Sequence, residues 1–146
     1  MSLGLYLHIP YCFSKCRYCD FYSAPGQRGV PRAYVDALLR ELSRFAPDAP
    51  LRPDTLYFGG GTPSLLDPAD AARLIAAAQP LPGAEITLEA NPETVTEDSL
   101  RAFREAGVNR ISFGVQSARD SQLKTLGRPH TAKQARAAFA AARRAG

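Results

Sequence analysis

Four short apolar segments along the chain are each followed by a segment with helical spacing. The apolar segments span residues 5–9, 55–58, 85–89 and 110–115, and the helical segments span residues 31–45, 67–78, 96–107 and 131–146. In the first helical segment, apolar residues between Tyr34 and Leu42 recur three or four positions apart, as on the buried face of an amphipathic helix. Four strand–helix repeats predict an α/β fold with parallel strands and helical crossovers.

Capping residues mark the ends of three of these helices. Asp67 precedes Pro68, which is a favoured first helical residue, and Thr96 precedes two acidic residues. Thr131 precedes the alanine-rich last helix, and Gly107 is expected to end the third. The residues between the fourth strand and Thr131 are expected to form a loop.

Two architectures share this pattern, a doubly wound open sheet and a TIM-like (β/α) barrel, and both carry functional loops at the carboxyl ends of the strands. Candidate functional residues lie where each predicted strand ends: the cysteines at 12–19, the glycines at 59–61, Glu89 and Gln116. They should therefore converge on one rim. This favours four βα units of a barrel. Because four strands cannot close one, we expect residues 1–146 to be the N-terminal part of a longer core domain, with more barrel strands and a C-terminal domain beyond it.

Composition and charge exclude several classes of protein. With 146 residues, 45% hydrophobic and 22% charged, the chain is expected to be one globular domain. It has no apolar run of about 18 residues and no signal-peptide pattern at its start, which predicts a cytoplasmic protein without a membrane span. Six basic and no acidic residues follow Asp120. This excess predicts a solvated helix face, with Arg143 and Arg144 near a helix C-terminus, rather than a nucleic-acid surface.

All three cysteines, Cys12, Cys16 and Cys19, lie in the loop after the first predicted strand. Thiolates this close in sequence can meet at one metal centre without long-range loop closure. Structural zinc prefers a fourth protein ligand, for which His8 and Asp20 are the nearby candidates. A four-iron cluster normally takes four cysteines, so three would leave one iron open to an exogenous ligand. Iron–sulfur, zinc and unligated cysteines all remain possible from the spacing, and a disulfide framework is disfavoured.

Residues 12–19 resemble the cluster loop of the radical S-adenosylmethionine (radical SAM) superfamily. The resemblance implies that the three cysteines hold a [4Fe-4S] cluster. In this superfamily, SAM binds the open iron, and an electron donor reduces the cluster so that SAM is cleaved to methionine and a 5′-deoxyadenosyl radical. Residues 5–11 and 20–23 resemble the branch that contains oxygen-independent coproporphyrinogen III oxidase and its heme-chaperone relatives.

The resemblance also implies a set of SAM-binding residues. By themselves, the glycines at 59–61 allow close backbone approach with inward N–H groups or simply a tight turn, and Glu89 is a ribose ligand or a surface acid. For Arg128 the alternative is an exposed side chain and for Tyr6 a core residue, and His8 and His130 are expected to be structural. The residues that match family SAM contacts are Tyr6, Tyr18, Gly60, Gly61, Thr62, Glu89, Gln116 and Arg128.

Two features favour the heme chaperones within this branch. Phe21 stands where the oxidase resemblance requires a further cysteine, and the first strand begins at about residue 5, without the oxidase's N-terminal extension. A chaperone would bind heme and transfer it to acceptor proteins. The alternatives are the oxidase, which converts propionate groups of a porphyrinogen to vinyl groups, and a zinc-stabilised α/β module without radical chemistry. The sequence assigns no catalytic residue.

Overall fold

The computed structural model describes residues 2–45 and 50–146. Four parallel strands form one sheet in the order β1-β2-β3-β4. The strands are β1 (Gly4–Ile9), β2 (Thr55–Gly60), β3 (Glu85–Ala90) and β4 (Arg110–Phe113). The helices are α1 (Arg32–Phe45), α2 (Pro68–Ala78), α3 (Glu97–Glu105), α4 (Asp120–Leu126) and α5 (Ala132–Ala145), with 3₁₀ turns η1 (Pro63–Leu65) and η2 (Pro92–Thr94).

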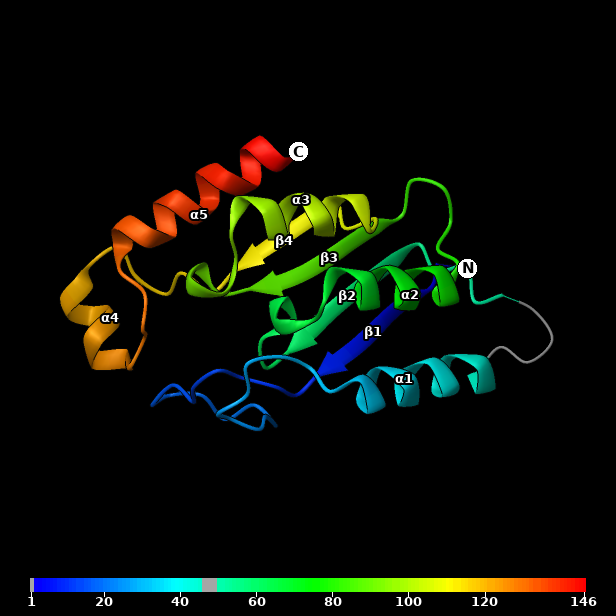
Figure 1. Cartoon of the computed structure of the whole chain (residues 1–146), viewed down its shortest axis with the longest axis horizontal. Helices are drawn as coiled ribbons and strands as arrows, with labels where there is room; N and C mark the ends of the chain where they lie inside the picture. The colour runs from blue at the N-terminus through cyan, green and yellow to red at the C-terminus, as the bar shows by residue number, and fades with distance from the viewer. Residues whose placement is uncertain (1, 46–49) are drawn as a thin grey trace.

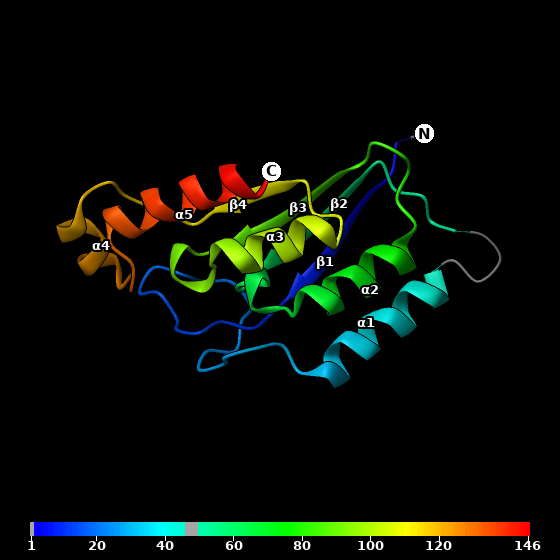
Figure 2. The same cartoon turned by 45° about the horizontal axis from the view of Figure 1, so that its top comes forward.

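The sequential strand order places the helices on one face of the sheet. Crossovers between parallel strands are right-handed, so a sheet that always grows in the same direction receives each helix on the same side. Figures 1 and 2 show α1, α2 and α3 packed side by side along that face. A doubly wound sheet would instead reverse its order and carry helices on both faces. The structure therefore confirms the predicted α/β class with parallel strands, and its strand order is that of a barrel segment.

The core lies between the sheet and these helices. Leu7, Phe58 and Leu88 are paired neighbours across three strands, and their side chains are buried on the helix-covered face. Val35 of α1 and Phe103 of α3 belong to the same apolar cluster. Alternation along each strand thus sends one set of side chains into the core.

The alternate residues of the strands lie on the opposite face of the sheet. Tyr6, Tyr57, Thr87 and Arg110 form one register row across it. Tyr6 is 54% exposed, and Arg110 donates to Thr87 and pairs with Glu85 at 3.2 Å. This face is polar and aromatic rather than aliphatic, as expected of a surface that lines the interior of a barrel segment.

The predicted caps are confirmed. Asp67 accepts a hydrogen bond from the Ala69 N–H at 2.8 Å, and Thr96 and Thr131 each form a capping box. The predicted loop after β4 was wrong in part, because it contains α4, a helix of seven residues that Gly127 ends in a left-handed conformation. A helix of two turns has too few apolar positions to show a period.

One further boundary needs correction. The fourth strand is shorter than predicted and ends at Phe113. The third helix stops as expected, since Ala106 is its C-cap and Gly107 follows with φ +112°. Arg143 and Arg144 are exposed in the last turn of α5 as predicted, and Arg144 in addition pairs with Glu97 at 2.7 Å and joins α5 to α3. Within residues 2–45 and 50–146, no helix is both long and apolar enough to cross a membrane.

Replacing Phe58 with alanine tests the described core. Because the Phe58 side chain is fully buried, we expect Phe58→Ala to lower the free energy of unfolding by about 3–5 kcal/mol, measured by urea denaturation. The matched control is Phe45→Ala, since Phe45 is 76% exposed and should change that free energy by less than about 0.5 kcal/mol. Equal losses in the two variants would contradict the assignment of the core.

Candidate functional site

A cavity of about 260 Å³ opens at the carboxyl ends of the strands. All four arrowheads in Figure 1 point to this end of the sheet, where the loop after β1 and helix α4 also lie. The cavity is lined by the cysteine loop, the glycine run at the end of β2, the ends of β3 and β4, and two residues of the segments that flank α4. Parallel pairing therefore brings together residues that are more than a hundred positions apart in sequence.

The cysteine loop joins β1 to α1 and is held at its base by backbone hydrogen bonds. The Cys12 N–H donates to the Ala24 carbonyl at 3.0 Å, and the Ala24 N–H donates back to Pro10 at 2.6 Å. Cys12 is buried, whereas Cys16 and Cys19 are partly exposed and linked by a turn. All three thiols are free and line the cavity, but no three Cys, His, Asp or Glu side chains of the described chain are grouped closely enough to hold a metal ion.

The glycine run at the end of β2, residues 59–61, packs directly against β1 and the base of the cysteine loop. A Cβ atom on Gly61 would lie 2.7 Å from the Tyr11 carbonyl oxygen and 2.9 Å from the Cys12 sulfur. Gly60 has φ +119°, and a Cβ there would overlap the His8 ring at 2.6 Å. The glycines are therefore required by the close approach of two loops and by backbone conformation.

The N–H groups of the glycine run are already used inside the protein. Gly61 donates to Ile9 at 2.9 Å, and Thr62 donates to Tyr11 at 2.8 Å. The Gly60 N–H donates to a Glu89 carboxylate oxygen at 3.1 Å. The expectation that these N–H groups turn toward a ligand was therefore wrong, and what the glycines offer a ligand is close access to the backbone.

Glu89 is the second-last residue of β3 and is oriented by two donors. Its second carboxylate oxygen accepts a hydrogen bond from the Tyr57 hydroxyl at 2.7 Å. Burial is the main cause that raises the pKa of Tyr57, and the hydrogen bond to Glu89 raises it further. The phenol therefore stays protonated at neutral pH and donates to Glu89. The carboxylate is thereby fixed at the cavity wall, with lone pairs remaining for a ligand's hydroxyl groups.

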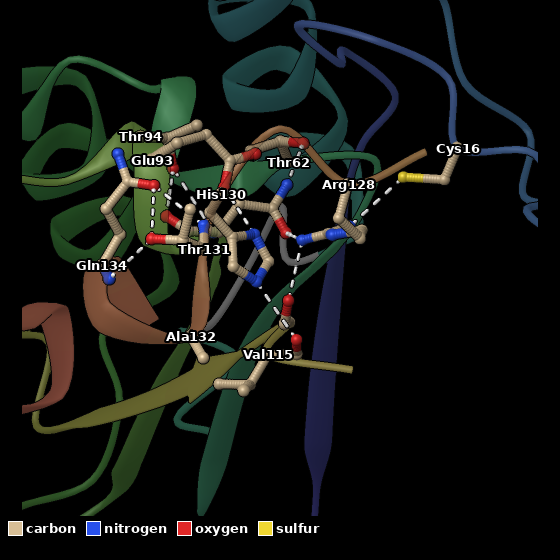
Figure 3. A network of polar contacts seen from close by, with 12 residues as sticks. Cys16, Thr62, Glu93, Thr94, Val115, Arg128, His130, Thr131, Ala132 and Gln134 are labelled. Carbon is tan, nitrogen blue, oxygen red and sulfur yellow. Dashed lines mark hydrogen bonds and ion pairs between the residues drawn. The ribbon is translucent and has the colours of Figure 1, made fainter. Parts of the chain in front are cut away.

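Arg128 joins three segments of the rim. Its guanidinium donates to the Cys16 sulfur at 3.3 Å, to the Gly114 carbonyl at 2.7 Å and to the Asn91 side-chain oxygen. Figure 3 shows Arg128 between Cys16 and the polar cluster of the neighbouring loops. A guanidinium suits this role because its donors diverge in a fixed plane.

A continuous chain of hydrogen bonds connects two of the cysteines through this arginine. Asn91 accepts from Arg128 and donates through its amide nitrogen to the Thr62 hydroxyl at 3.1 Å. The Thr62 hydroxyl in turn lies 3.6 Å from the Cys12 sulfur, to which it donates. The chain runs from Cys12 to Cys16 across residues that follow all four strands.

One donor in this network has no partner. Across the described residues, Arg128 Nε is the single buried side-chain nitrogen or oxygen without a hydrogen bond. A buried unpaired donor raises the free energy of the folded protein, and at a cavity wall it fits an anionic ligand group. Cysteine thiolates are the usual ligands of iron–sulfur clusters. The three thiols of the lining are thus of the ligand type that a cluster takes, and the unpaired Arg128 donor fits an anionic ligand group beside them.

The structure brings together all but one of the residues that the sequence selected. The exception is Tyr6, which lies outside the cavity lining, shares a 3.0 Å hydrogen bond with His8 and stacks on Tyr57. Burial raises the pKa of Tyr18 at the cavity wall, although the neighbouring Arg128 charge opposes this shift. The selected residues in the lining are Cys12, Cys16, Cys19, Tyr18, Gly60, Gly61, Thr62, Glu89, Gln116 and Arg128.

Sequence reasoning missed residues that act through their neighbours. Tyr57 and Asn91 orient Glu89 and Arg128, and neither was selected. Strand alternation offered a signal for Tyr57. It lies two residues before Gly59, the first glycine of the run, and so shares the same face of the sheet. The position of Asn91 two residues after Glu89, before Pro92, offered another.

Comparison with known proteins gives consistent matches. The sequence profile of the Radical SAM superfamily matches residues 6–146. The heme chaperone HemW of Escherichia coli strain K12 is 47% identical over 142 residues. The mitochondrial radical S-adenosyl methionine domain-containing protein 1 of Bos taurus is 41% identical over 151 residues. Among solved structures, the radical SAM enzyme coproporphyrinogen III oxidase (HemN) of Escherichia coli matches with a TM-score of 0.84 and 32% identity.

These matches cover nearly the whole chain but only part of each relative. The HemW match covers 93% of this chain and 38% of that protein, and the Bos taurus match covers 97% and 33%. The oxidase structure matches 99% of this chain with 35% of its own. The chain thus spans little more than a third of the length of the curated relatives it matches.

Replacing Gly61 with alanine tests the contact between the two loops. The added Cβ would collide with Tyr11 and the Cys12 sulfur, so the cysteine loop must move away. Overpacking of this kind costs about 1–3 kcal/mol, which corresponds to an increase of roughly 5- to 150-fold in the rate at which an alkylating reagent modifies the buried Cys12 thiol. Trypsin separates the three cysteines at Lys15 and Arg17, so mass spectrometry can follow Cys12 alone.

The matched control for this variant is Gly29→Ala in the same loop. A Cβ on Gly29 would have only the Leu65 carbonyl oxygen within 4 Å, at 3.9 Å. The rate of Cys12 modification should therefore stay at the level of the parent protein. An unchanged rate in Gly61→Ala would show that the glycine run does not hold Cys12 in place.

Proposed function

The chain belongs to the radical SAM superfamily, and on that premise we propose that it forms the cofactor-binding part of a heme chaperone. Cys12, Cys16 and Cys19 would hold a [4Fe-4S] cluster, and SAM would bind beside it in the cavity at the carboxyl ends of the strands. The whole protein would bind heme and transfer it to acceptor proteins, with an electron donor reducing the cluster.

The observation that carries this proposal is the position of three free thiols on the wall of one cavity beside an unpaired buried arginine donor. When bound, a cluster with one open iron and SAM would supply one-electron chemistry. The residues of this chain would bind and orient these groups. Arg128 and Gln116 would contact the carboxylate or ribose of SAM, and Glu89 would accept hydrogen bonds from the ribose hydroxyls.

The remaining proposed SAM-binding residues act around these contacts. Gly60 and Gly61 would admit the methionine part of SAM close to the backbone, since neither carries a Cβ. Thr62 links the glycine run to the Cys12 thiol, so it would hold both in register. Tyr18 would cover the cavity from the cysteine loop. Tyr6 would contact SAM from β1, on the sheet face opposite the helices.

The chaperone is favoured over the oxidase by one position of the cysteine loop and by the comparisons. Phe21 lines the cavity two residues after Cys19, where the oxidase resemblance requires a further cysteine. The identity to the heme chaperone HemW is 47%, against 32% to the oxidase HemN. The oxidase remains the second candidate because its structure superposes on nearly the whole chain.

Assays on the full-length, anaerobically reconstituted protein separate these functions. A heme chaperone should bind heme and transfer it to an acceptor apoprotein, without forming vinyl groups from coproporphyrinogen. Turnover of coproporphyrinogen would reject the chaperone and support the oxidase. Metal analysis tests the third candidate, a zinc-stabilised module. About one zinc per chain with no iron or sulfide would reject both the chaperone and the oxidase.

Replacing Cys16 with alanine tests the ligand set. Two thiolates cannot hold a four-iron cluster, so Cys16→Ala should abolish the absorbance at roughly 400 nm after anaerobic reconstitution. The matched control is Ser14→Ala, which changes a neighbouring cavity residue without removing a thiol and should keep this absorbance. A persistent band in Cys16→Ala would show that other residues hold the cluster.

Replacing Glu89 with glutamine tests the ribose contact. The amide is isosteric and can still accept from the Gly60 N–H while its NH₂ group donates to the Tyr57 oxygen, so only the charge is lost. A hydrogen bond to a charged group contributes about 1.5–3 kcal/mol, and we expect SAM affinity to fall by roughly 10- to 100-fold. Isothermal titration would measure the SAM affinity, and the iron and sulfide content would show that the cluster is intact. An unchanged affinity would remove Glu89 from the proposed site.

A further inference from the structure

His130 is a buried side chain that the proposed cofactor contacts do not use. It follows α4, two residues after Arg128, and its side chain is 0% exposed. Its ring lies between the 3₁₀ turn η2 after β3 and the loop after β4, as Figure 3 shows. A polar ring is costly to bury unless both its nitrogens are hydrogen-bonded, so its partners define its role.

Both ring nitrogens face oxygen atoms. Nε2 lies 3.1 Å from the Val115 carbonyl oxygen, and Nδ1 lies 3.1 Å from a Glu93 carboxylate oxygen. A carbonyl oxygen only accepts, so Nε2 must carry a proton and donate it. The contact between Nδ1 and Glu93 needs a second proton, carried by one of the two atoms, and this hydrogen bond fixes the direction in which Nε2 points. His130 is therefore oriented by η2 and acts on the loop after β4.

The contacted peptide belongs to a strained turn. Gln116 has φ +64°, in the left-handed region that side chains other than glycine rarely adopt. The Ser117 N–H donates to the Val115 carbonyl at 2.8 Å, which closes a three-residue γ-turn around Gln116. A γ-turn with positive φ at its centre is rare and strained, and persists where surrounding contacts hold it.

The Val115 carbonyl thus accepts two hydrogen bonds, one from Ser117 and one from His130. Its orientation is tied to the φ angle of Gln116, because the carbonyl and the Gln116 nitrogen belong to one planar peptide. Since Gln116 lines the cavity, whatever holds this peptide also sets the position of the Gln116 side chain.

We propose that His130 is a positioning residue that holds the strained turn at Gln116 and thereby aims the Gln116 amide into the cofactor cavity. The consequence of this positioning, tighter SAM binding, rests on the proposed function. The hydrogen bond from a buried ring is the element that stabilises the turn, and the pairing with Glu93 keeps that ring from rotating. His130 touches no ligand itself.

Two variants of His130 separate the contact with Val115 from the mere filling of space. A glutamine amide nitrogen can take the place of Nε2, so His130→Gln should keep the hydrogen bond to Val115. An asparagine amide takes the place of Nδ1, so His130→Asn should keep the contact with Glu93 and lose the one with Val115. The thermal midpoint of each variant shows whether it has folded.

The experiment measures SAM affinity of the reconstituted full-length protein by isothermal titration, in the parent and in a Gln116→Ala background. We expect His130→Asn to weaken SAM binding by about tenfold and His130→Gln to leave it near the parent value. In the Gln116→Ala background, His130→Asn should have little further effect, since it acts through the amide that is already absent. An equal loss in both backgrounds, or no loss in either, would overturn the proposal.

A second measurement does not depend on SAM. Hydrogen exchange of the Ser117 amide, followed by NMR, reports whether the γ-turn is closed. Exchange should be faster in His130→Asn and unchanged in His130→Gln, and equal rates in the two variants would contradict the positioning role. If the parent protein binds no SAM, the proposed function fails, and the Ser117 exchange rates alone then decide the role of His130.

Discussion

The parallel direction of the four strands is the constraint on which the site depends. Each strand ends at the same rim, and the right-handed crossovers send the helices to one face of the sheet, where they bury the aliphatic half of each strand. The loops after the strands are then neighbours in space whatever their distance in sequence. The stable part of the fold, built around Phe58 and Leu88, is thus separate from the polar rim that it supports. Changes in the rim can alter binding without removing the core.

The rim loops are held together as a unit by the hydrogen-bond chain from Cys12 through Thr62, Asn91 and Arg128 to Cys16. Each member either touches a thiol or fixes a residue that does. Polar networks in a low-dielectric environment are strong only when their members are satisfied, and this one is complete except for Arg128 Nε among the described residues. The network thus holds the loops in one arrangement, which lowers the entropy that binding must remove.

Local patterns in the sequence were enough to predict the fold class and the capped helix starts, whereas the residues selected in the cavity lining depended on the cysteine spacing and on the family resemblance. The spacing of Cys12, Cys16 and Cys19 and the glycine run are local features whose chemistry follows from residue type. Tyr57 and His130 could not be assigned in this way, since their roles depend on partners more than thirty residues away, Glu89 and Glu93, that only the register and packing of the elements reveal. Helix α4 was missed because seven residues are too few for a periodic signal.

Two features of the rim raise the free energy of the folded protein. The left-handed Gln116 costs about 1–3 kcal/mol, and a buried unpaired donor such as Arg128 Nε costs about 1–3 kcal/mol. Both costs are comparable with the contribution of one large core side chain, so the core can sustain them. Both also fall on residues that line the same cavity. A ligand that offers an acceptor to Arg128 Nε removes the cost of the unpaired donor. A ligand that contacts the Gln116 amide does not have to spend binding energy on orienting it, because folding has already set its position.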